Sequence, residues 1–244
     1  MDRKLRANGL HNPKFTSERP EIAALRLEEG HWEDDTVVGK KAGKEEVILS
    51  LLEKKTENYI ALRIPGKDAD SVLKAMQLLK QTFVDRFSQV FKTITVDNGP
   101  EFSGFAQIEN WGSQIYFAHP HTSWERPQNE HHNGLFCAFV PKGASIEDYS
   151  AEYILVADKL NGRPRRKLGY QPPEDLFERI LDSVYAAWRL RQCRSRCKPM
   201  ASVVNITLIR RFLPRKCPTC TCNLRIISKI LARAIENFDD SVRF

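Results

Sequence analysis

Three acidic residues lie at the ends of separate predicted elements, where carboxylates could do chemistry. Asp35 is at the start of a predicted strand, Asp97 directly follows another, and Glu130 is in the first turns of a predicted helix. In an open α/β sheet a polar site lies beyond the strand ends, so these side chains could converge. A carboxylate cluster without thiolates suits Mg²⁺ or Mn²⁺, and two such ions would support phosphoryl transfer. The alternative is that Glu130 decorates a solvated first turn, where the helix macrodipole favours a carboxylate.

The elements that must position these residues form a mixed α/β pattern. Three β-branched runs separated by turn residues predict an antiparallel meander, and apolar residues spaced by three and four over 68–84 predict an amphipathic helix. Asp68 or Asp70 can cap its start, and Pro127 suits the first turn of the helix that carries Glu130. The predicted strands are 36–38, 47–52, 59–64, 91–96 and 114–117, and the later helices are 128–140, 146–160 and 174–188.

Composition limits the class of protein. With 244 residues, 41% hydrophobic and 28% charged, the chain can bury a core and is not disordered throughout. No apolar run is long enough to cross a bilayer, and the N-terminus lacks the apolar stretch of a signal peptide, so we expect a cytoplasmic protein without a membrane partner. The net charge of +7 suggests a polyanionic partner, but residues 1–177 are nearly neutral and the positive excess lies in 178–244.

Five motifs follow one another in the chain over roughly 150 residues. They are His31–Gly39 (HWEDDTVVG), Thr95–Phe102 (TVDNGPEF), Ser123–Glu130 (SWERPQNE) with Asn133–Leu135 (NGL), Pro141–Gly143 (PKG) and Leu160–Tyr170 (LNGRPRRKLGY). Together they resemble the catalytic core of bacterial transposases of the insertion sequence 30 family, and five matches in the same order make the resemblance specific.

The resemblance implies a fold, a site and a reaction. The family's core is similar to retroviral integrase, an α/β ribonuclease H-like fold with a mixed five-stranded sheet flanked by helices. By the resemblance, Asp35, Asp97 and Glu130 are the catalytic, metal-binding Asp, Asp, Glu triad, with Asn98, Asn129 and Asn133 in support. The expected cofactor is Mg²⁺ or Mn²⁺, as two ions. The expected activity is DNA cleavage and strand transfer on transposon ends and target DNA, in a bacterial protein that is nucleoid-associated when bound and a homo-oligomer when assembled on DNA.

Several positions depart from the family's pattern. Asp34 stands where the family has Gly, and because strand alternation puts Asp34 and Asp35 on opposite faces, only one of them can reach the metals. We assign Asp35, which aligns with the family's aspartate. Pro127 replaces Gly and His131 replaces Asn around Glu130. The family also carries an N-terminal helix-turn-helix region that recognises transposon ends, and this chain starts just upstream of the core.

Other polar clusters give weaker signals. Arg163, Arg165, Arg166 and Lys167 form a dense basic cluster that we expect to contact DNA phosphates, as we do Lys142; the alternative is a solvated charge run. The histidines at 119, 121, 131 and 132 fit no common metal-ligand spacing and are interpreted as surface or DNA-proximal residues.

We expect a leader over 1–30 that packs little core, a catalytic core over 31–187 and a basic tail over 188–244. The tail region could bind zinc through Cys193, Cys197, Cys217, Cys220 and Cys222, or could have been added by a frameshift or by fusion to neighbouring sequence. Two functional alternatives remain: a catalytically impaired fragment that only binds DNA or intact transposase, and a general ribonuclease H-like nuclease.

Overall fold

The structure is a computed structural model that describes residues 14–39, 45–120, 122, 125–140, 143–149 and 152–194, without the side chains of 147, 152–155 and 186–194. The chain divides into two compact units, Met1–Phe177 and Glu178–Phe244. The first unit holds every element up to the start of α7 (Pro173–Arg194), and within the second unit the described part is the remainder of that helix. No helix in these ranges is both long and apolar enough to cross a membrane.

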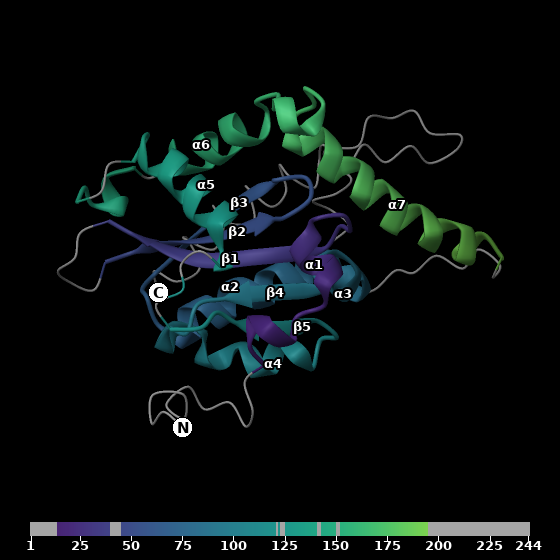
Figure 1. The fold of residues 1–244 in the computed structure, drawn as a ribbon, viewed down its shortest axis with the longest axis horizontal. Coiled ribbons are helices and arrows are strands. Elements are labelled where there is room, and N and C mark those ends of the chain that lie inside the picture. Colours follow the sequence, from purple (N-terminus) through teal and green to yellow (C-terminus); the bar gives the residue numbers. More distant parts are fainter. Residues whose placement is uncertain are drawn as a thin grey trace, which may run out of the picture. The chain divides into compact units, whose positions relative to one another are not determined.

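A five-stranded mixed sheet, in the order β3-β2-β1-β4-β5, is the centre of the first unit (Figure 1). β1 pairs antiparallel with β2, and β2 antiparallel with β3, whereas β1 and β4 run parallel, as do β4 and β5. This topology confirms the expected α/β class with a mixed five-stranded sheet. The strands are β1 (His31–Val38), β2 (Val47–Glu53), β3 (Tyr59–Ile64), β4 (Thr93–Val96) and β5 (Gln114–Phe117).

Helices cover both faces of this sheet. α5 and α6 lie over β1, β2 and β3, while α2 and α4 lie on the opposite side (Figure 1). The bounds are α1 (Glu21–Leu25), α2 (Ala69–Phe83), α3 (Phe87–Val90), α4 (Ala106–Glu109), α5 (Pro127–Cys137) and α6 (Glu152–Asn161), with short 3₁₀ turns that include η2 (Thr16–Glu18), η4 (Pro100–Phe105), η6 (Ile146–Tyr149) and η7 (Arg166–Leu168). Asp68 caps α2 by accepting a hydrogen bond from the Ser71 backbone N–H at 2.9 Å, as its sequence position predicts.

The core explains why β1 begins five residues earlier than predicted. Trp32 is fully buried, stacks on Phe91 with ring centroids 4.6 Å apart, and donates its indole N–H to the Val90 carbonyl at 2.8 Å. Because polar residues follow Trp32, the first half of this strand lacks the β-branched run that is typical of a strand. The predicted helix over 146–160 is likewise two elements, η6 and α6.

Residues 14–19 of the leader pair with the edge of the sheet. Phe15 forms a bridge with Phe117 on the edge strand β5, where the Phe117 N–H donates to the Lys14 carbonyl at 2.8 Å. Arg19 reaches the next strand and donates to the Thr95 hydroxyl at 3.1 Å. An edge strand presents unpaired backbone groups, and the leader satisfies part of them. Residues 14–19 therefore cover part of the sheet edge, whereas the expectation that the leader packs little core stays a prediction, with Ala23 the one buried apolar side chain among the described residues 14–30.

Candidate active site

Asp35 and Asp97 lie side by side on neighbouring strands. In the parallel pair β1 and β4, Glu33 is opposite Thr95, so Asp35 and Asp97 are each two residues farther along. Neighbouring strands are about 4.8 Å apart, which brings the two carboxylates to one opening at the C-terminal end of β4. Burial raises the pKa of Asp35; the Arg126 guanidinium opposes this rise and the Asp97 charge adds to it.

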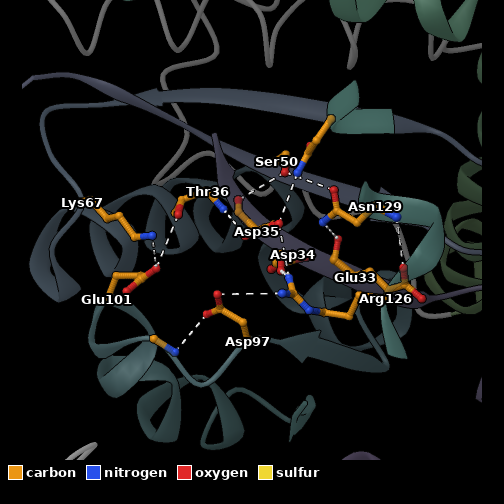
Figure 2. A network of polar contacts seen from close by, with 12 residues as sticks. Glu33, Asp34, Asp35, Thr36, Ser50, Lys67, Asp97, Glu101, Arg126 and Asn129 are labelled. Atoms are coloured by element: carbon orange, nitrogen blue, oxygen red, sulfur yellow. Dashed lines mark hydrogen bonds and ion pairs between the residues drawn. The ribbon is translucent and has the colours of Figure 1, made fainter. Parts of the chain in front are cut away.

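Arg126 lies between these two carboxylates (Figure 2). Its guanidinium nitrogens are 3.5 Å from Asp35 Oδ2 and 3.8 Å from Asp97 Oδ2, and Nη1 donates to the Asp34 carbonyl at 3.0 Å. The side chain is only 7% exposed. Because Arg126 immediately precedes α5, this contact joins the helix that carries Glu130 to the ends of β1 and β4.

The structure separates the roles of Asp34 and Asp35. Asp34 is fully buried, neither of its carboxylate oxygens has a hydrogen-bond partner in the described part of the chain, and burial raises its pKa well above the ordinary value. Asp35 keeps a 20% exposed side chain and faces Asp97 and Arg126. This difference favours Asp35 as the residue that can reach a ligand.

Hydrogen bonds hold the two aspartates in place. Asp35 Oδ1 accepts the Thr36 backbone N–H at 2.8 Å, and Asp35 Oδ2 accepts the Asn133 side-chain amide at 3.3 Å. Asp97 Oδ1 accepts the Gly99 N–H at 2.9 Å, closing the predicted turn. A Cβ at Gly99 would lie too close to the Glu101 carboxylate, so any larger residue here would displace that carboxylate.

The three asparagines expected to support the site differ in what they touch. Asn133 contacts Asp35 directly and accepts the Tyr59 hydroxyl at 2.9 Å. Asn129 is buried and holds β1 instead, since its side-chain amide donates to the Glu33 carbonyl at 2.8 Å. Asn98 is half-buried in the turn after Asp97.

Glu130 is not grouped with the two aspartates. It is exposed on α5, one turn before Asn133, and in the described ranges no three His, Cys, Asp or Glu side chains gather closely enough to hold a metal ion. The buried face of α5 is instead formed by Gln128, Asn129, His132 and Phe136.

The residues present fit a hard divalent cation in two of the three expected positions. Carboxylate oxygens are the ligands that Mg²⁺ and Mn²⁺ prefer. The position of Arg126 shows that a positive charge is accommodated between Asp35 and Asp97. Glu130 stands on the helix that begins beside this pair, but its carboxylate is not among the groups that converge.

The remaining sequence-based candidates lie elsewhere. Arg163, Arg165, Arg166 and Lys167 gather beside α5 and α6, while Lys142, His121 and four of the tail cysteines lie outside the described residues. Cys193 falls in α7, at a position whose side chain is not described. His132, interpreted above as a surface residue, is instead buried, because it stacks against Tyr59 under α5.

Sequence reasoning passed over two residues of this network. Arg126 is part of the motif Ser123–Glu130. Its position directly before Pro127, where α5 begins, could have indicated that it lies near the strand ends. Glu101 is buried with a 1% exposed side chain, lies 3.0 Å from Lys67 Nζ, and accepts the Thr36 hydroxyl at 3.4 Å (Figure 2). An acid so close after Asp97 could have indicated this second ion pair.

Comparison with known proteins confirms the resemblance to insertion-sequence transposases. The chain is 38% identical over 169 residues to the probable transposase for insertion-like sequence element IS1161 of Streptococcus salivarius, covering 69% of this chain and 47% of that protein. It is 35% identical to the transposase for insertion sequence element IS4351 of Bacteroides fragilis, covering 68% and 49%. The transposase InsI for insertion sequence element IS30C of Escherichia coli is 36% identical, with 62% and 38% covered.

The chain thus spans about half the length, or less, of the curated relatives it matches. No protein-family model matches it. Among solved structures, the catalytic core domain of BIV integrase aligns at a TM-score of 0.46 and 21% identity, covering 63% of this chain and 97% of that domain.

Proposed function

We propose that this relative of insertion-sequence transposases is a DNA-strand transferase core that cleaves and joins DNA in a reaction dependent on a divalent metal. The observation that carries the proposal is the position of Asp35 and Asp97, which lie next to each other at the ends of the parallel strands β1 and β4 with the Arg126 guanidinium between them. Asp35, Asp97 and Glu130 would bind Mg²⁺ or Mn²⁺, as two ions. Bound metal would activate the attacking oxygen and stabilise the leaving oxygen.

The reaction has two in-line displacements at phosphorus. In the first, a water oxygen bonds to phosphorus and the bond to the 3′ oxygen breaks, which leaves a 3′-hydroxyl and a 5′-phosphate. In the second, that 3′ oxygen bonds to a phosphorus of target DNA and displaces the target's own 3′ oxygen. The protein forms no covalent intermediate, so its residues act by binding and orientation.

The chain's own side chains supply that orientation. Asn133 and the Thr36 N–H fix the carboxylate of Asp35, and the Gly99 N–H fixes that of Asp97. Arg126 neutralises both carboxylates while the site carries no other cation. The substrates would be transposon ends and target DNA, bound by a homo-oligomer, because two ends must be joined.

Nicking of supercoiled plasmid, alongside a gel shift on the same preparation, tests the proposal. We expect nicked circles whose formation depends on Mg²⁺ or Mn²⁺. The Asp97→Asn variant should nick at least about 100-fold more slowly, since loss of a metal ligand costs several kcal/mol of transition-state stabilisation. Full activity in Asp97→Asn would contradict it. Binding without metal-dependent product would favour the impaired-fragment alternative, and cleavage of RNA–DNA hybrids would favour a general nuclease.

A further inference from the structure

A basic pocket of about 650 Å³ opens between α5 and the loop that follows α6. Its walls are residues 163–167 together with His131, Leu135 and Leu160. Four of the five loop residues are Arg or Lys, and among the residues that the structure describes no acidic side chain lines the pocket. Its volume falls within the range of roughly 300 to 1,000 Å³ that is typical of ligand sites.

Two of the four basic side chains already have partners within the protein. Arg165 donates to Glu57 Oε2 at 2.7 Å and to the Leu160 carbonyl at 3.1 Å, and it also contacts His132. Lys167 forms an ion pair with the same Glu57 carboxylate. Burial opposes ionisation of Glu57, but these two cations outweigh it and hold its pKa below the ordinary value. Arg165 therefore anchors the loop to the turn between β2 and β3.

The other two cations are open to a ligand. Arg163 and Arg166 are exposed, and neither side chain has a hydrogen bond or an ion pair with any residue in the described part of the chain. Guanidinium groups match phosphate oxygens in a bidentate geometry. Leu135, Leu160 and Pro164 add an apolar surface against which a sugar can pack. Paired guanidiniums beside apolar side chains suit a sugar-phosphate backbone.

The pocket also borders the helix that carries Glu130. His131, in the pocket wall, directly follows Glu130 on α5, and Leu135 is one turn farther along the same helix. We infer that this pocket binds the sugar-phosphate backbone of substrate DNA as it passes Glu130, with Arg163 and Arg166 contacting phosphates and Arg165 fixing the loop. The inference rests on the proposed function for the identity of the polyanion, and it separates contacting from anchoring residues in a cluster that looks uniform in the sequence.

The salt dependence of DNA binding tests the inference. Binding of the full chain to a fluorescein-labelled duplex is measured by anisotropy over a series of salt concentrations, with EDTA present so that no cleavage occurs. Each phosphate contact contributes close to one unit to the slope of log K against log salt concentration. We expect Arg163→Gln/Arg166→Gln to flatten this slope by about 2 units.

The matched control is Lys74→Gln/Arg86→Gln, which removes two charges on α2 and the turn after it, outside the pocket. It should change the slope by less than about 0.5 unit. The single variants Arg163→Gln and Arg166→Gln, each flattening the slope by about 1 unit, replace the double variant if that protein does not fold. Equal slopes for the pocket variant and the wild type, or equal flattening by the control, would overturn the inference.

The two proposals fail in different ways. Asp97→Asn should slow nicking by about 100-fold or more yet keep the wild-type salt slope, because Asp97 lies outside the pocket lining. If wild-type protein does not nick DNA but the pocket variant still loses the slope, the binding site stands without the reaction. If nicking depends on metal and Asp97 while the pocket variant binds like the wild type, the reaction stands and the pocket inference is wrong.

Discussion

The acidic site and the basic pocket treat their charges in opposite ways. At the acidic site, Arg126 lies between Asp35 and Asp97, and the nearby Glu33 is paired with Lys54 inside the core. At the pocket, Arg163 and Arg166 are exposed, and their side chains lack partners within the described ranges. A charge that folding removes from water needs a partner inside the protein, whereas an exposed charge stays hydrated and can pair with a ligand. We therefore expect the first region to govern stability and the second to govern DNA binding.

The largest effect should come from the buried pair. Lys54 Nζ is 3.2 Å from Glu33 Oε1, with side chains that are 4% and 1% exposed. Lys54→Ala leaves the buried Glu33 carboxylate without this ion pair, and we expect a loss of about 3 to 5 kcal/mol in the free energy of unfolding. Urea denaturation followed by circular dichroism measures it.

The next residue in the chain provides the control. Lys55 pairs with Glu29 at 2.7 Å, but both side chains are well exposed. Lys55→Ala should therefore cost less than about 0.5 kcal/mol. Equal losses for the two variants would show that burial is not what distinguishes these pairs.

A smaller loss, of about 2 to 3 kcal/mol, is expected for Arg126→Gln without metal, since Asp35 and Asp97 then face each other without a cation. Added Mg²⁺ should restore more stability to this variant than to the wild type, because the ion takes over the neutralisation. Melting temperatures with EDTA and with Mg²⁺ measure both parts. A variant as stable as the wild type in EDTA would mean that Arg126 does not hold the carboxylates together.

His132 contacts Arg165 of the basic pocket and should give the smallest effect. Burial lowers the pKa of His132 to about 4, and the neighbouring Arg165 guanidinium adds to this lowering, while the hydrogen bond from Nδ1–H to the Gln128 carbonyl opposes it. As pH falls below the ordinary histidine value, the unfolded chain takes up the proton first, so folded stability is lost from pH 6.5 toward pH 4. We expect about 1 to 2 kcal/mol of this loss between pH 6.5 and 5.

Denaturation across that pH range, compared with His132→Gln, isolates this residue from the other titrating groups. The variant should lose less stability on acidification, measured from its own value at neutral pH. Parallel pH curves for the two proteins would show that His132 is not the group that takes up the proton.

Local patterns predicted much of the fold and part of the site. The β3 and β5 bounds and the Asp68 cap follow from alternation and turn residues, because these signals involve neighbours in the chain. The start of β1 and the packing of the leader depend on contacts with Phe91 and Phe117, which are distant in sequence. Their partners cannot be identified from local periodicity.

The same distinction applies to function. Strand ends and helix starts pointed to Asp35, Asp97 and Glu130, and the structure brings the first two together. The role of Arg126 and the division of the basic cluster by Glu57 both depend on ion pairs between residues that are 29 or more positions apart. A sequence shows the charge of such residues but not which of them are already paired.

The most direct test of the central claim uses two adjacent residues on one strand. Asp34 and Asp35 differ in whether the side chain is buried alone or faces Asp97, and replacement by Asn keeps the size of each. The measurement is the rate of metal-dependent plasmid nicking by Asp34→Asn and Asp35→Asn, each checked for folding by circular dichroism. We expect Asp34→Asn to keep activity near that of the wild type and Asp35→Asn to lose about 100-fold or more. The reverse pattern, or full activity in Asp35→Asn, would contradict an active site built on Asp35 and Asp97.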